Sequence, residues 1–96
     1  MIVGVATADL HIPQARSLKD KRRVVKSLLD RVAHKHRVSA AEIEHQDLRQ
    51  RSQLGFALVN SDRHHAIAAL EDIHRLVAQR DDAFLTDWHS DLIEDF

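Results

Sequence analysis

The sequence has 96 residues, with no cysteine, one proline and two glycines. Without thiols it can form no disulfide, thiolate zinc site or cysteine nucleophile, and it fits a reducing compartment, so we expect a cytoplasmic protein. So few prolines and glycines leave no low-complexity linker, and 44% hydrophobic residues predict one folded domain over residues 1–96. Residues 1–6 are only briefly apolar and carry no basic segment, which indicates a strand, not a signal peptide or membrane span.

Motifs typical of enzymes are also missing, because the sequence contains no P-loop, GxGxxG, GxSxG or HExxH. Asp9 with His11, and His45 with Asp47, are spaced i, i+2, which is common for ordinary hydrogen-bonded neighbours on a strand. Eight histidines raise the question of a metal site, but those in the expected helices lack the i, i+4 spacing of a ligand pair. His11, His45 and His89 would converge only through the fold. We therefore expect no enzyme activity, no cofactor and no metal ion.

Charge is unevenly distributed, although the formal net charge is only −1. Residues 16–37 carry nine lysines and arginines against two aspartates, a net charge of +7. Residues 81–96 carry six carboxylates and no lysine or arginine. Such a separation is typical of a polyanion-binding face beside an acidic tail, or of two surfaces that attract each other in a homo-oligomer.

Hydrophobic periodicity predicts six elements in the order βαββαβ. The expected strands span residues 2–12, 38–45, 54–59 and 84–93, and the expected helices span residues 18–36 and 63–80. Ser17 and Asp62 are the N-caps that begin the helices. In the last strand, alternation places four side chains on the buried face, namely Phe84, Thr86, Trp88 and Leu92. Right-handed crossovers then favour an α+β, ferredoxin-like sandwich with a four-stranded antiparallel sheet of order 4-1-3-2 and both helices on one face.

Polar residues from three separated segments are expected to meet at one end of this fold, where the first strand ends, the first helix begins and the second hairpin turns. The expected anion- or RNA-binding residues are Arg16, Lys19, Lys21, Arg22, Arg23, Lys26, Arg49 and Arg51. Motif residues accompany them: Asp9, His11, His45, Gln46, Asp47 and Gln50. A helix N-terminus beside lysines and arginines favours an anion. The alternative is internal pairing and a solvated face, with the stem of Lys21 packed and its ammonium at the rim.

The open face of the sheet offers few aromatic residues, since Phe56 is expected to point inward. Base stacking is therefore not expected, and any RNA contact should be to backbone phosphates and should depend strongly on salt. The apolar part of this face, with Val3, Val5 and Val59, would suit a second copy of the chain, so a homodimer is a further expectation.

Four stretches resemble the YlxP-like family of small bacterial proteins, a domain of unknown function. They are residues 2–5, 9–13, 17–28 and 45–51, of which the S-L-K-D-K-R and H-Q-D-L-x-Q-R runs are the most specific. The resemblance implies a ferredoxin-like fold and genes that often neighbour those of translation initiation and ribosome-maturation factors, but no known reaction. We therefore predict a non-enzymatic protein that binds RNA or the ribosome and no membrane. The alternatives are a homo-oligomeric interaction or regulatory module and, least favoured, a small enzyme built around His11, His45 and Asp47.

Overall fold

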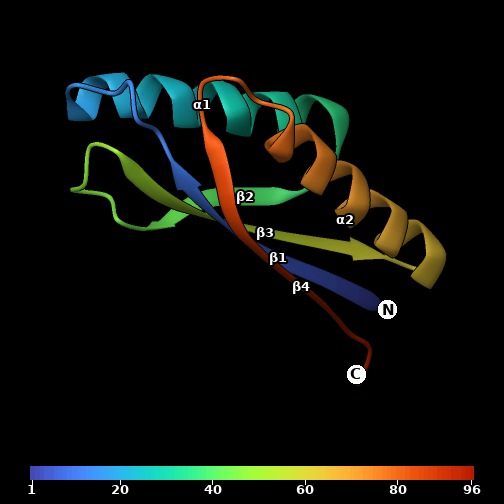
Figure 1. The fold of residues 1–96 in the computed structure, drawn as a ribbon. Helices are drawn as coiled ribbons and strands as arrows, with labels where there is room; N and C mark the ends of the chain where they lie inside the picture. The colour runs from blue at the N-terminus through green and yellow to red at the C-terminus, as the bar shows by residue number, and fades with distance from the viewer.

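The computed structural model describes residues 1–96 and contains four strands and two helices (Figure 1). In chain order these are β1 (Ile2–His11), α1 (Leu18–Lys35), β2 (Ser39–Glu44), β3 (Arg51–Asn60), α2 (Arg63–Ala78) and β4 (Phe84–Ile93). Every strand pair is antiparallel, and the strands lie in the order β2-β3-β1-β4. The expected ferredoxin-like α+β fold is confirmed, including its sheet order.

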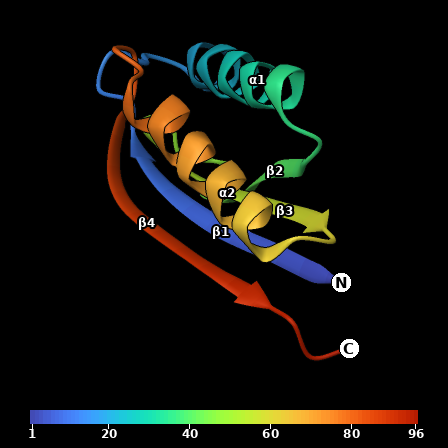
Figure 2. The ribbon, with the colours of Figure 1, turned by 90° about the vertical axis from the view of Figure 1, so that its right-hand side faces the viewer.

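Both helices cover the same face of the sheet, and the other face is open (Figure 2). Small residues on the covered face of β1, including Ala6 and Ala8, are buried and let α2 approach closely. At Gly4 a Cβ atom would lie 3.1 Å from side-chain carbons of Leu58 and Leu70, which is tight for a van der Waals contact. Seventeen buried residues form one core between this face and the helices.

Side-chain caps begin both helices as expected. Ser17 Oγ accepts a hydrogen bond of 3.0 Å from the Asp20 N–H at the start of α1. Asp62 Oδ1 accepts one of 3.0 Å from the His65 N–H at the start of α2. This second bond is the main reason that the pKa of Asp62 is lowered. Neither helix combines the length and the apolar character needed to cross a membrane.

A β-bulge interrupts the pairing of β1 with β4. Asp9 lies opposite Asp87, but the next residue, Leu10, lies opposite Leu85, so Thr86 has no partner in β1. One extra residue shifts the alternation of a strand by one position, which moves every side chain beyond it to the other face.

The bulge overturns part of the expected pattern of β4. Leu85 packs against the core, whereas Phe84 is 58% exposed and Thr86 is exposed as well. The expectation that Phe84 and Thr86 face the core is therefore wrong. Trp88 and Leu92, which follow the bulge, pack against the core as expected.

Candidate functional site

Lys21, in the first turns of α1, is fully buried and connects the helix to the β2–β3 hairpin. Its Nζ atom donates to the carbonyl oxygens of His45 at 2.7 Å, Gln46 at 3.1 Å and Arg51 at 3.3 Å. It also lies 3.0 Å from Oε2 of Glu42. The expectation that Lys21 binds an external anion is wrong, and so is the alternative of an ammonium at the rim. The helical pattern placed Lys21 near the core. It could not show the hydrogen-bond acceptors of the ammonium, because these belong to a hairpin that is distant in the sequence.

The loop between β2 and β3 is attached to the β1–α1 connection as well. Nε2 of Gln50 donates to the carbonyl oxygens of Pro13 and Ala15, both at 3.1 Å. The Ile12 N–H donates to the Gln50 carbonyl at 2.8 Å. His45 has a left-handed backbone with φ of 65°, which histidine adopts more readily than bulky apolar residues do. His45, Gln46 and Gln50 therefore hold the loop in place, and their motif has a structural role.

The remaining motif residues lie nearer the surface. Asp47 is exposed at the tip of the loop, and His11 is exposed at the end of β1. Asp9 is half-buried, and its Oδ1 accepts a hydrogen bond of 2.8 Å from Nε2 of Gln53. The expected cluster is thus divided between side chains that fix the hairpin and side chains that face solvent.

Six cations at this end of the molecule are exposed and have no ion-pair partner. These residues, which we call the basic surface, are Arg16, Lys19, Arg22, Arg23, Arg49 and Arg51. They come from the first turns of α1, the segment before it and the β2–β3 turn, which lie at the same end in Figure 1. Arg31 and Arg37, farther along the chain, are also exposed and unpaired. The fold therefore leaves most of the positive charge of α1 free.

Two features of the expected anion site, Lys26 and the N-terminus of α1, attract an anion less strongly than the sequence indicated. Lys26 is exposed, but its Nζ lies 2.6 Å from Oδ2 of Asp30. At the N-terminus of α1, Oδ2 of Asp20 accepts a hydrogen bond of 2.9 Å from the Arg16 N–H. A carboxylate already sits where the positive end of the helix dipole would attract an anion. Side-chain charges, and not the helix end, give this surface its positive potential.

Three exposed side chains form a row across the open face at the same end. His11 of β1 lies opposite Phe84 of β4 on one side and opposite Arg51 of β3 on the other. The sequence pattern missed the exposure of Phe84, because a bulge depends on the pairing of two strands and leaves no clear local signal.

The family model described as "Protein of unknown function (DUF503)" matches residues 3–90. The chain belongs to this family. It is 39% identical over 77 residues to "Uncharacterized protein YlxP" of Bacillus subtilis (strain 168), and the match covers 80% of each chain. The YlxP-like resemblance is thereby confirmed. A solved structure of a REP-associated tyrosine transposase bound to a REP hairpin matches with a TM-score of 0.44 at 9% identity. That match covers 98% of this chain but only 57% of the transposase chain.

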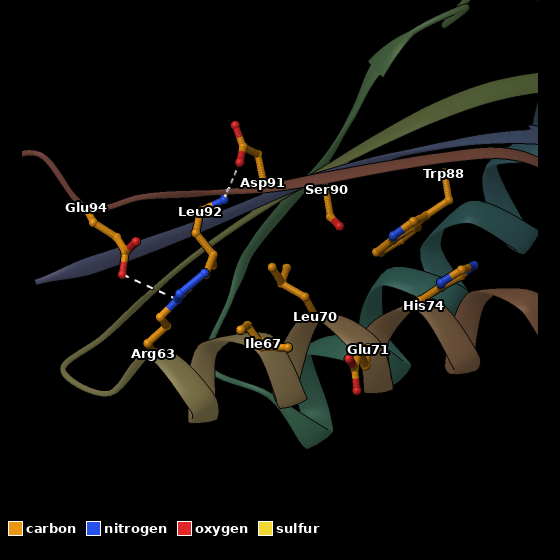
Figure 3. Close-up of a pocket in the computed structure, with 10 residues that line it drawn as sticks. All are labelled: Arg63, Ile67, Leu70, Glu71, His74, Trp88, Ser90, Asp91, Leu92 and Glu94. Carbon is orange, nitrogen blue, oxygen red and sulfur yellow. Dashed lines mark hydrogen bonds and ion pairs between the residues drawn. The ribbon is translucent and has the colours of Figure 1, made fainter.

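A cleft of about 460 Å³ lies between α2 and β4 of this DUF503 member (Figure 3). The His74 ring stacks on Trp88 with centroids 4.5 Å apart and planes inclined by 4°. At the other end, Nε of Arg63 lies 3.7 Å from Oε1 of Glu94. Arg63 is the only lysine or arginine that lines the cleft, and it is already paired with Glu94. The cleft is therefore a weaker anion site than the basic surface.

No three side chains of histidine, aspartate or glutamate are grouped so that they could hold a metal ion. His11, His45 and His89 were the three histidines that could converge only through the fold. Nε2 of His89 instead lies 2.9 Å from Oδ2 of Asp87.

Proposed function

We propose that this chain binds RNA through the phosphate backbone, with the basic surface as the contact area. The observation that supports this proposal is the set of six exposed, unpaired cations at one end of the molecule. An unpaired lysine or arginine can contact a phosphate without losing an existing partner, and each contact releases counterions from the nucleic acid. The proposed role is binding, without a chemical step.

The attachment of the hairpin supports the same proposal. Arg49 and Arg51 are on or beside a loop that Gln50 and Lys21 fix to the rest of the molecule. Cations on a fixed loop lose less conformational freedom on binding than cations on a mobile one. The basic surface is therefore largely arranged before a ligand arrives.

The opposite charge of β4 would orient the ligand. Two of the six carboxylates of residues 81–96, Asp87 and Asp91, lie on this edge strand, where they repel a polyanion. RNA is thus directed towards the end that carries the basic surface and away from the part of β4 that carries Asp87 and Asp91.

The direct test is a double charge reversal, Lys19→Glu with Arg23→Glu, assayed with purified small-subunit ribosomal RNA and with a DNA duplex of equal length. Both side chains are exposed and unpaired, so the variant should fold normally. We expect its affinity for RNA to fall by about tenfold or more at moderate salt. The matched control is Arg31→Glu with Arg37→Glu, at two exposed and unpaired cations farther along the chain, which changes the net charge equally and should retain more affinity. Equal losses in the two variants, or no loss in either, would contradict the assignment of this surface.

A second candidate function is self-association, in which two copies of the chain form a homodimer through the open faces of their sheets. Val3 lies between Val59 and Ile93 in one row, and the latter two are 65% and 44% exposed. An exposed apolar row is a reason to expect an interface. Sedimentation of the wild type and of Val59→Lys tests it, since a dimer through this row should dissociate in the variant, and a monomeric wild type rules it out.

A further inference from the structure

Phe84 is an aromatic ring held in solvent by the strand that carries it. It is 58% exposed, whereas Phe56 is buried and Trp88 packs against the core. The bulge fixes this orientation, because Leu85 anchors the strand in the core and Oγ1 of Thr86 donates to the Asp9 carbonyl at 3.1 Å. The ring is therefore presented on the open face by a residue of β4 that is paired with β1.

The neighbours of this ring are the kinds of group that bind a nucleobase. His11 lies directly opposite Phe84, and Arg51 lies on the other side of His11. All three side chains face the open side, because the residue next to each one faces the core. Opposed residues on paired strands have Cα atoms about 4.5–5.5 Å apart, so the three groups form one continuous row. Aromatic rings and arginine guanidinium planes both stack on bases.

The charges around the row limit how a ligand could lie. In the next row along the sheet, Asp9 lies opposite Asp87, and these carboxylates would repel a phosphate. Beyond the row, in the other direction, is the loop with Arg49. The sugar-phosphate backbone of a bound RNA strand would thus run around the end of the molecule and place one base on the open face of the sheet. It would not follow the sheet along its length.

We infer that Phe84, His11 and Arg51 form a binding site for one unpaired nucleobase of single-stranded RNA, while the basic surface holds the adjoining phosphates. This inference rests on the RNA-binding function proposed above and adds the class of RNA. In a duplex each base is already stacked and paired, so Phe84 has no free base face to contact. The site therefore selects single strands over duplexes.

The experiment compares a short single-stranded RNA with the same strand annealed to its complement, with 2-aminopurine at one position to report stacking. We expect the wild type to prefer the single strand and to quench 2-aminopurine. Phe84→Ala should lose about fivefold to a hundredfold in affinity for the single strand, the range for one stacked base, and should bind the duplex as the wild type does. Phe84→Trp should restore both stacking and affinity.

The matched control is Phe96→Ala, because Phe96 is 74% exposed at the C-terminus, far from the basic end (Figure 1). It should behave as the wild type does. If Phe84→Ala matches the wild type on the single strand while the double charge reversal loses RNA, the nucleobase site is refuted and phosphate binding stands. If the wild type binds neither RNA, both proposals fail. Urea unfolding of each variant establishes that losses come from the contact surface and not from the fold.

Discussion

Lys21 places a positive charge in the interior, where an ammonium is stable only if acceptors for its N–H groups and a counter-ion are supplied together. Three backbone carbonyls and the Glu42 carboxylate supply them. Glu42 in turn accepts a hydrogen bond of 2.5 Å from Oγ of Ser52, and no buried side-chain polar atom is left without a partner. This one residue therefore determines how the β2–β3 hairpin sits against α1.

Replacing Lys21 with methionine keeps most of the apolar stem but removes the charge. Glu42 would then be left without its cation and the three carbonyls without their donor, so we expect a loss of about 3–5 kcal/mol in the free energy of unfolding. Urea unfolding measures it. Lys19→Met makes the same substitution on an exposed face and should stay within about 0.5 kcal/mol of the wild type. Equal midpoints for the two variants would show that the buried contacts contribute nothing.

At the scale of single elements, the Ser17 cap determines where α1 begins. Removal of its hydroxyl leaves the Asp20 N–H without an acceptor, so Ser17→Ala should cost about 1 kcal/mol of stability. Thermal or urea unfolding gives the value. Ser61→Ala changes an exposed serine for which the structure has no side-chain hydrogen bond, and it should be nearly neutral. A neutral Ser17→Ala would mean that the cap is not formed in solution.

Asp72, in the interior of α2, connects that helix to the C-terminal end of α1. Its carboxylate accepts a hydrogen bond of 2.6 Å from His36 and also contacts Lys35. The His36 bond, followed by that of Lys35, lowers the pKa of Asp72 to about 2. A carboxylate with a lower pKa in the folded chain stabilises the fold above its unfolded pKa, and this stabilisation disappears as the pH falls towards the folded value.

Asp72→Asn should therefore be less stable than the wild type at about pH 6, and this difference should shrink between about pH 4 and pH 2. Urea midpoints across that range test the claim. Asp47→Asn, at an exposed carboxylate without a partner, should show no such pH-dependent difference. A gap between Asp72→Asn and the wild type that is as large at pH 2 as at pH 6 would rule out the ionised carboxylate as its source.

Elements that depend on local sequence could be predicted, and those that depend on partner strands could not. The helices, their caps and the strand order follow from periodicity, Ser17, Asp62 and crossover handedness, and all agree with the structure. Lys21 and Phe84 were assigned wrongly. The hydrogen-bond acceptors of Lys21 come from the β2–β3 hairpin, and the bulge that exposes Phe84 depends on how β4 pairs with β1. The meeting of three polar segments at one end was predictable from topology, whereas the division of their residues into buried and exposed was not.

At the scale of the whole molecule, the unpaired cations of the basic surface lie at one end (Figure 1). The chain is elongated, with extents of 43, 21 and 19 Å. Along the β4 edge lie the carboxylates of Asp87 and Asp91. A polyanion approaching this molecule meets a field that directs it to the basic end. This orientation is the physical basis of the proposed function.

The most direct test is the salt dependence of RNA affinity. If the six cations of the basic surface each contact a phosphate, the logarithm of the association constant should fall with the logarithm of salt concentration with a slope of roughly −4 for a single strand. Lys19→Gln and Arg23→Gln should each reduce the magnitude of the slope by about 0.7. A slope near zero, or slopes unchanged in both variants, would contradict the account.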